Sequence, residues 1–191
     1  MCRYLHARSP PVIHRDLKSP NLLMNQATHV VKVCDFGLSR CKEATATMTA
    51  IGTCQWTAPE VLRRDAYSEM ADVWSMGVIV WELTALDLPF NGMTAIRVAA
   101  AVAYQGLRLE PVEGCPSPLA DLMASCMADE PRHRPSFADL VTRLEALAAS
   151  PDFAMPGDGN RDRGAGFEGH TSGASYADVQ LELANSAGPR A

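Results

Sequence analysis

Four polar side chains near the start of the sequence are of the types that transfer of a phosphoryl group requires. Asp16, Lys18 and Asn21 lie within one short segment, and Asp35 follows after an apolar stretch. Phosphoryl transfer depends on positioning and charge neutralisation, so it needs metal-binding oxygens, a cation and a group that orients the nucleophile. A carboxylate and an amide oxygen suit Mg²⁺, a hard cation that keeps several waters. These residues therefore indicate a candidate site for metal-assisted phosphoryl transfer.

A predicted β-hairpin explains how two of these side chains come together. The segments 22–24 and 30–33 are short and apolar, and a polar turn at 25–28 separates them. Antiparallel pairing folds the chain back on itself, so Asn21 and Asp35, at the two open ends, are expected to lie side by side.

The rest of the folded part is predicted to be mostly helical. Residues 1–8 are expected to be the last turns of a helix that begins before the chain does, ended by Ser9-Pro10-Pro11. Ser68 is expected to cap a helix from about 69 to 85, which is almost wholly apolar and therefore buried. Residues 38–57 show no period and are predicted to form a loop. Three further helices are predicted from their end signals: Thr94 with Gly106, Ser117 with Pro118, and the capping box of Ser136 and Asp139.

Composition sets the class of protein and its compartment. The net charge is −5 and no Lys/Arg cluster occurs, which excludes a typical nucleic-acid binder. Six cysteines form no C-x-x-C pair, so reduced intracellular thiols are expected, in the cytoplasm with the nucleus also open. The apolar run 73–85 is too short to span a bilayer and contains Glu82.

One folded domain followed by a tail is the predicted organisation. Residues 1–150 have the apolar content of a single core. Residues 151–191 are rich in Gly, Asp, Arg and Ser and have few large apolar side chains. Such a segment cannot bury enough surface to offset its ordering entropy, so it is predicted to be disordered.

The ordered set of motifs resembles the catalytic core of a eukaryotic protein kinase. The segment from His14 to Asn21 reads HRDLKSPN, Asp35-Phe36-Gly37 follows, and Ala58-Pro59-Glu60 closes the segment that begins at Asp35. The motif from Trp56 to Glu60, WTAPE, is similar to that of the serine/threonine kinases of the tyrosine-kinase-like group, the Raf-like and mixed-lineage relatives. The resemblance implies a kinase C-lobe fold, mostly α, with a short β-hairpin bearing the catalytic loop.

The resemblance implies a role for each polar residue of the site. Asp16 would accept the proton of the substrate hydroxyl, and Lys18 would contact the transferring phosphate. Asn21 and Asp35 would hold Mg²⁺ against the phosphates of ATP. Such an enzyme would transfer the γ-phosphate of ATP to Ser or Thr of protein substrates.

Further roles follow from the same resemblance. Leu23 would lie beneath the adenine and Cys34 would line the ATP site, although an ordinary core residue is an open alternative for each. Thr53 would contact the catalytic Asp and Lys. Arg15 would bind a phosphate on the activation loop, with Thr49 as the phosphosite; Thr45, Thr47 or an unmodified loop remain alternatives. Glu60 and Arg134 would form a buried ion pair.

The sequence contains no Gly-rich phosphate loop, no strand lysine of the V-A-I-K type and no partner glutamate on a preceding helix. A C-lobe with the N-lobe absent is therefore expected, inactive as an isolated chain and in need of an N-lobe or a partner kinase. Two alternatives are a non-catalytic binding or scaffold module, which would dock substrates or other kinases, and a truncated gene model.

Overall fold

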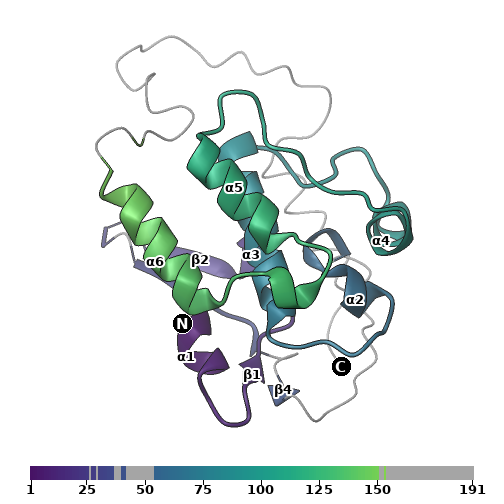
Figure 1. Ribbon diagram of the computed structural model, residues 1–191, viewed down its shortest axis with the longest axis horizontal. Helices are drawn as coiled ribbons and strands as arrows, with labels where there is room; N and C mark the ends of the chain where they lie inside the picture. Colours follow the sequence, from purple (N-terminus) through teal and green to yellow (C-terminus); the bar gives the residue numbers. More distant parts are fainter. Residues whose placement is uncertain (26, 29, 37–39, 42–53, 151–152, 154–191) are drawn as a thin grey trace.

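The computed structural model of the chain describes residues 1–25, 27, 28, 30–36, 40, 41, 54–150 and 153. Helices make up most of its ordered elements, as expected, and two small antiparallel sheets accompany them (Figure 1). The helices are α1 (Cys2–His6), α2 (Pro59–Leu62), α3 (Met70–Ala85), α4 (Ala95–Tyr104), α5 (Ser117–Cys126) and α6 (Phe137–Ala148). The strands are β1 (Val12–Ile13), β2 (Leu22–Asn25), β3 (Val30–Val33) and β4 (Arg40–Cys41). Short 3₁₀ turns occur at Ser19–Asn21, Cys54–Trp56 and Pro131–His133.

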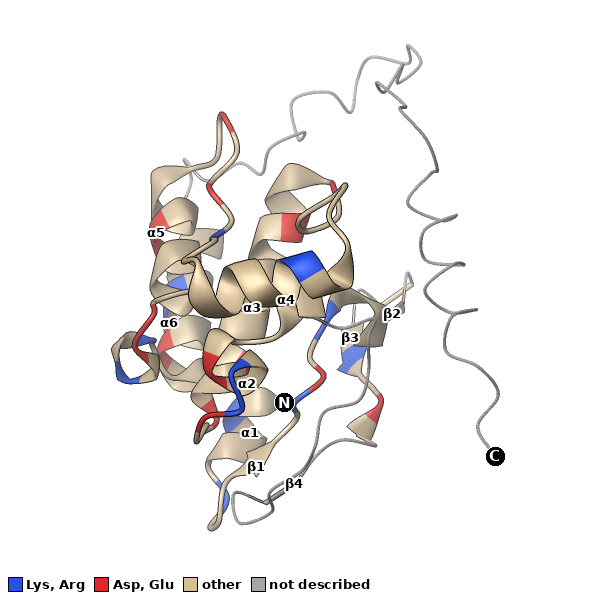
Figure 2. Ribbon diagram, turned by 90° about the vertical axis from the view of Figure 1, so that its right-hand side faces the viewer, with Lys and Arg blue, Asp and Glu red and all other residues tan. Residues whose placement is uncertain are grey.

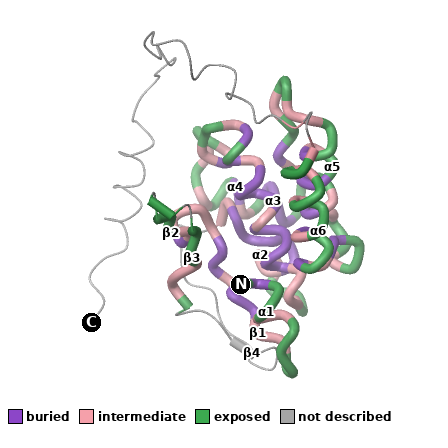
Figure 3. Tube along the Cα trace, turned by 90° about the vertical axis from the view of Figure 1, so that its left-hand side faces the viewer, coloured by how far each residue is buried: buried purple, intermediate pink, exposed green. Residues whose placement is uncertain are grey.

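Helix α3 is the centre of the hydrophobic core. It is apolar on all sides, and its buried residues include Val73, Trp74 and Val78. Helix α5 packs directly against it, and the buried positions concentrate along α3 and its neighbours (Figure 3). The predicted buried helix is therefore confirmed, beginning at Met70; the hydroxyl of Ser68 accepts a hydrogen bond from the amide of Met70 at 3.3 Å.

Gly77 makes the close contact between α3 and α5 possible. A Cβ atom at this position would lie 2.7 Å from Cβ of Cys126 and 3.0 Å from Cγ of Met127. A methyl group does not fit there without movement of one helix. Met127 itself is buried and fills part of the space beside Gly77.

The predicted helix ends agree with the structure in two cases and shift in two others. The N-cap of α3 is Glu69, one residue after the predicted Ser68. Thr94 caps α4 by accepting from the amide of Arg97, and the capping box of Ser136 and Asp139 begins α6. The cap of α5 is Pro116, one residue before the predicted Ser117. No side-chain capping bond begins this helix, and Pro118 stands in its first turn, where the missing amide of proline costs nothing.

The predicted hairpin is confirmed as the β2–β3 pair. Leu22 lies opposite Val33, and the amide of Cys34 donates to the carbonyl of Asn21 at 2.9 Å. The prediction of a loop over 38–57 is wrong at β4, because Arg40–Cys41 pairs with Val12–Ile13, and at the 3₁₀ turn of Cys54–Trp56. A two-residue strand is too short to show a period in the sequence. The remaining residues of 38–57 lie outside the described ones.

The C-terminal end and the surface of the described part complete the description of the fold. Beyond Ser150 only Phe153 is described, half-buried against the core, so the predicted tail at 151–191 otherwise lies outside the described residues. In the view of Figure 2, acidic and basic positions are interspersed over the helices. No helix in the described part of the chain combines the length and the apolar character that crossing a bilayer requires.

Candidate active site

Asp72 of α3 holds the backbone of the catalytic loop, residues 14–21, in place. Its Oδ2 accepts a hydrogen bond from the amide of His14 at 2.8 Å, and its Oδ1 accepts one from the amide of Arg15 at 2.9 Å. The ring of His6 in α1 adds a third contact, with Nε2 at 2.8 Å from Oδ2. Arg15 has a φ of 70°, a left-handed conformation that is costly for a residue with a side chain. The two backbone contacts to this buried carboxylate keep the loop in its strained geometry.

The two carboxylate oxygens of Asp16 differ in their partners among the described residues. Its Oδ2 lies 3.0 Å from Nζ of Lys18 and accepts from Nδ2 of Asn21 at 3.1 Å. Its Oδ1 is buried and has no hydrogen-bond partner among the described residues. Asp16 is only 5% exposed, so the free oxygen is held in a place from which most water is excluded. The arrangement offers one oriented acceptor beside a fixed cation, which is what a proton acceptor for a substrate hydroxyl requires.

The hairpin places Asn21 beside Cys34, the residue before Asp35: the amide of Cys34 donates to the carbonyl of Asn21 at 2.9 Å. Nδ2 of Asn21 donates to the carbonyl of Asp16 at 2.7 Å, so the amide group is oriented with its nitrogen toward the catalytic loop. The carbonyl oxygen of the amide is then the atom available to a metal. Asp35 has a φ of 59°, a second left-handed residue at the site. One amide oxygen and one carboxylate fit a Mg²⁺ ion that retains waters.

His14 connects the catalytic loop to the end of β3. Its Nδ1 accepts from the amide of Asp16 at 3.3 Å, so Nε2 carries the proton and donates to the carbonyl of Cys34 at 3.1 Å. The ring also contacts Phe36, with centroids 4.9 Å apart and planes tilted by 59°. The imidazole of His14 therefore links the catalytic loop to the segment that carries Asp35, in addition to the backbone bonds of the hairpin.

The two residues predicted to line a nucleotide site lie on or beside the hairpin. Cys34 is half-buried. Leu23 is 57% exposed, and Met24, Val30 and Val31 are exposed as well. The register places Leu23 with Val30 on one face of the hairpin and Met24 with Val31 on the other. We call these four residues the hairpin surface. Figure 3 shows both strands as mostly exposed.

The residues predicted for regulation are only partly described. Thr49 and Thr53 lie outside the described residues. Arg15 is described: its Nη1 donates to the hydroxyl of Tyr67 at 2.9 Å, and its Nε is buried with no partner among the described residues. The contact with Tyr67 could not be predicted, because no local pattern connects residues so far apart.

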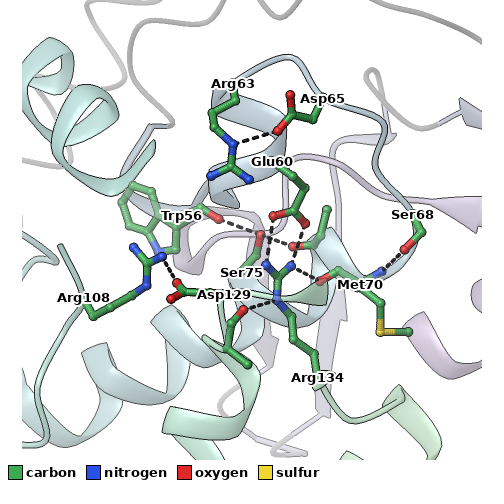
Figure 4. A network of polar contacts seen from close by, with 12 residues as sticks. Trp56, Glu60, Arg63, Asp65, Ser68, Met70, Ser75, Arg108, Asp129 and Arg134 are labelled. Carbon is green, nitrogen blue, oxygen red and sulfur yellow. Dashed lines mark hydrogen bonds and ion pairs between the residues drawn. The ribbon is translucent and has the colours of Figure 1, made fainter. Parts of the chain in front are cut away.

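The predicted ion pair between Glu60 and Arg134 is present and bidentate (Figure 4). The two N–O distances are 2.7 and 2.9 Å, and the side chains are 3% and 0% exposed. Arg134 also donates to the carbonyls of Met70 and Ala128, and its guanidinium lies 5.2 Å from the centroid of the Trp74 ring. This network joins the end of the activation segment, residues 35–60, to the start of α6.

Glu82 is a buried acidic residue whose contacts the sequence did not reveal. Its two carboxylate oxygens accept hydrogen bonds from the hydroxyl of Ser19 at 2.8 Å and from the indole of Trp56 at 2.7 Å. Burial raises the pKa of Glu82, and the hydrogen bonds from Trp56 and Ser19 oppose the shift. The available signal was an acidic residue in a largely apolar helix, because a buried charge requires partners.

Comparison with known proteins identifies the family to which the chain belongs. Residues 1–144 match the family model described as protein tyrosine and serine/threonine kinase. The chain is 46% identical over 149 residues to the serine/threonine-protein kinase CTR1 of Arabidopsis thaliana, covering 77% of this chain and 18% of that protein. It is 44% identical over 163 residues to mitogen-activated protein kinase kinase kinase 11 of Homo sapiens, covering 81% of this chain and 19% of that protein.

A third relative, from a different lineage, shows similar values. It is the probable serine/threonine-protein kinase drkA of Dictyostelium discoideum, 43% identical over 147 residues, with 77% of this chain and 23% of that protein covered. The chain thus spans less than a quarter of the length of these three curated relatives. The resemblance to serine/threonine kinases of the tyrosine-kinase-like group that the motifs predict is confirmed. The chain belongs to the protein tyrosine and serine/threonine kinase family.

Proposed function

We propose that this chain is the catalytic C-lobe of a protein kinase that transfers the γ-phosphate of ATP to Ser or Thr of protein substrates. The observation that carries the proposal is the state of Asp16. One of its oxygens is held by Lys18 and Asn21, and the other is buried and free among the described residues. A carboxylate held in this way is prepared to accept a proton from a hydroxyl.

Each residue of the site has a role in this reaction. Asp16 orients the substrate hydroxyl and takes its proton at Oδ1. Lys18, next to the same carboxylate, offsets the negative charge of the transferring phosphoryl group. Asn21 and Asp35 would hold Mg²⁺, which neutralises phosphate charge when it is bound. Because the hydrogen bonds fix these groups before substrate arrives, little reorganisation is required during the reaction.

The nucleotide is expected to bind against the hairpin. Leu23 would lie beneath the adenine and Cys34 would form part of the wall of the site. The hairpin surface supports a second lobe as the cover: on the face of Leu23, which is 57% exposed, Val30 is 49% exposed, so large apolar side chains there lack a protein neighbour. We infer that residues 1–150 form the C-lobe and that an N-lobe or a partner kinase covers this surface. By itself the chain is expected to be inactive, because the adenine and the phosphates would be uncovered, and electrostatic stabilisation of the phosphates is weak where water reaches them.

Regulation by phosphorylation is part of the proposal. Arg15 would bind a phosphate on Thr49, and Thr53 would contact Asp16 and Lys18. The bond of Arg15 to Tyr67 supports this, because a bond to a neutral hydroxyl can be exchanged for a stronger, charge-assisted bond to phosphate. We also propose an intracellular protein with protein substrates. All five cysteines with described side chains are free.

The test is phosphorylation of a generic Ser/Thr substrate by a chimaera that joins the N-lobe of the CTR1 relative to this chain. We expect activity in the chimaera and none in the chain alone. Asp16→Asn should reduce kcat by about 10²- to 10⁴-fold, the usual contribution of general acid–base catalysis. Asp121→Asn, an exposed aspartate of α5, is the matched control and should leave kcat unchanged.

Two outcomes would contradict the proposal. The first is near-wild-type turnover in the folded Asp16→Asn chimaera. The second is a chimaera that folds and binds ATP but transfers no phosphate, which would favour the alternative of a non-catalytic binding module.

A further inference from the structure

Tyr67 lies in the connection between α2 and α3 and is bonded to the catalytic loop. Its hydroxyl accepts a hydrogen bond from Nη1 of Arg15 at 2.9 Å, across 52 positions of the sequence. Residues 64–66, which precede it, are exposed, and Tyr67 itself is half-buried. A tyrosine hydroxyl next to an exposed stretch of chain is therefore held directly against a permanent positive charge.

The two other tyrosines with described side chains are placed differently. Tyr104, at the end of α4, is 73% exposed. Tyr4 is 62% exposed, and the guanidinium of Arg8 lies over its ring, 4.9 Å from the centroid, rather than at its hydroxyl. Among the residues that the structure describes, Tyr67 is thus the tyrosine whose hydroxyl receives a bond from a guanidinium.

The guanidinium of Arg15 is held in place and has a donor to spare. The backbone of Arg15 is fixed by the bond from its amide to Asp72 at 2.9 Å. Its Nε is buried and has no hydrogen-bond partner among the described residues. A hollow beside the bond is lined by both side chains and by Thr57 and Val61. A group attached to the hydroxyl of Tyr67 would therefore meet a fixed cation at the edge of a hollow.

A phosphate on Tyr67 would suit this environment better than the hydroxyl does. It carries about −1.5 to −2 charges and three acceptor oxygens. The neutral bond to Arg15 would become charge-assisted and about twice as strong. The carboxylate of Asp72 also lines the hollow and would oppose the phosphate, but both of its oxygens already accept hydrogen bonds from backbone amides.

We propose that the hydroxyl of Tyr67 is a phosphorylation site whose phosphate Arg15 binds, and that this modification prevents activation through the activation segment. The phosphate comes from ATP, through a separate tyrosine-directed kinase. A bond forms between Oη of Tyr67 and the γ-phosphorus, the bond from that phosphorus to the bridging oxygen of ADP breaks, and the phenolic proton is released.

The effect on activation rests on the proposed function, which assigns Arg15 to a phosphate on Thr49. One guanidinium carries a single positive charge, whereas two phosphates beside it would together carry about −3 to −4 charges. They would repel each other and compete for Arg15. Because the hydroxyl of Tyr67 is already bonded to Arg15, a phosphate there occupies the guanidinium first. Phosphorylation of Tyr67 therefore acts in the opposite sense to phosphorylation of Thr49.

The first experiment asks whether Tyr67 accepts phosphate in the folded chain. The 191-residue chain is incubated with ATP and the catalytic domain of a tyrosine kinase, digested with trypsin and mapped by mass spectrometry. Cleavage after Arg64 and Arg97 gives a peptide in which Tyr67 is the single tyrosine, and Tyr104 lies in the next peptide. We expect phosphate on both, more slowly on the half-buried Tyr67. Tyr67→Phe is the control for the assignment.

The second experiment tests the pairing with Arg15 and needs no kinase activity of the chain. Phosphotyrosine is incorporated at position 67, or at position 104 as the matched control, and its removal by a tyrosine phosphatase is timed. At position 67 we expect removal to be about 10- to 100-fold faster in Arg15→Gln than in the wild-type background, the factor for one hydrogen bond to a charged group. Arg15→Lys, which keeps the charge, should retain part of the protection. At position 104 the rates should be equal.

The third experiment measures competition in the active chimaera. With Thr49 phosphorylated, phosphotyrosine at position 67 should lower kcat/KM by about 10-fold or more, the value of one charge-assisted bond. Phosphotyrosine at position 104 should leave it within about twofold, since no arginine contact is lost there. With Thr49 unphosphorylated, the effect at position 67 should be much smaller.

Three results would overturn the inference. Phosphate found on Tyr104 and never on Tyr67 would show that Tyr67 is not an acceptor. Equal removal of phosphate from position 67 in the wild type, Arg15→Lys and Arg15→Gln would show that Arg15 does not hold it. Equal kcat/KM with and without phosphate at position 67 would refute the competition. An inactive chimaera would instead contradict the proposed function, and the first two experiments would still decide whether Tyr67 is a phosphate site paired with Arg15.

Discussion

The buried pair of Glu60 and Arg134 should be among the most expensive contacts of the fold to break. Both side chains are almost fully buried, and two hydrogen bonds join them. Removing one partner of such a pair costs about 3 to 5 kcal/mol, because the other charge remains buried and unpaired. We therefore expect Glu60→Ala to lower the free energy of unfolding by this amount.

Arg134→Ala should be more damaging than Glu60→Ala. The guanidinium also donates hydrogen bonds to the carbonyls of Met70 and Ala128. Each carbonyl left without its donor adds about 1 kcal/mol to the loss of stability. The total of about 5 to 7 kcal/mol is comparable with the whole stability of many domains. Glu60→Gln keeps the volume and one acceptor, so it should fold and give a smaller, measurable loss.

Urea unfolding of the chain, followed by tryptophan fluorescence and far-UV circular dichroism, measures these differences. The control is the exposed pair of Glu130 and Arg132, with 3.7 Å between its atoms and exposures of 60% and 78%. Glu130→Ala should cost about 0 to 1 kcal/mol. If Glu60→Ala costs no more than Glu130→Ala, the assignment of the buried pair as a structural anchor is refuted.

Three other predictions concern packing, pH and thiol chemistry. Gly77→Ala should lower Tm and destabilise the chain by about 1 to 3 kcal/mol through the clash with Cys126, and Cys126→Gly should restore part of the loss. The hydrogen bonds from the side chain and backbone of Ser136 lower the pKa of Asp139, so the carboxylate stabilises the fold above its unfolded pKa and this stabilisation is lost as the pH falls. In Asp139→Asn the stability should therefore fall less between neutral and acid pH than in the wild type. An acid unfolding profile identical to that of the wild type would contradict the prediction. Burial raises the pKa of Cys2 to about 11 and that of Cys126 to about 12, so iodoacetamide at neutral pH should label neither thiol before unfolding; rapid labelling of either in the native protein would show that the core is open there.

The sequence predicted the parts of the site whose order and spacing are local. The catalytic loop, the hairpin that follows it and the capping box of α6 all depend on residues within a few positions of one another. Asn21 and Asp35 could be placed together because a hairpin has a simple geometry. The pair of Glu60 and Arg134 was predicted from the resemblance to kinases, because no pattern in a single sequence joins residues so far apart.

The contacts that were missed are those between distant polar groups. Glu82 with Ser19, Arg15 with Tyr67 and the short β1–β4 pair each join segments without any shared period. From the sequence, Glu82 shows only that the apolar run 73–85 is not a membrane span. Its burial and its partners depend on where α3 lies in the folded chain, which hydrophobic patterning specifies only as a buried helix.

Asp72 has a consequence for moving this chemistry to another protein. The octapeptide HRDLKSPN holds the residues that define the site, but its backbone at His14 and Arg15 is bonded to a carboxylate 58 and 57 residues further along the chain. A graft of the octapeptide alone would leave these two amides to water and would release the strained φ of Arg15. A transplantable unit must therefore include a buried helix that presents an acidic residue in the position of Asp72. The octapeptide and this helix together form the smallest unit that keeps the loop in its geometry.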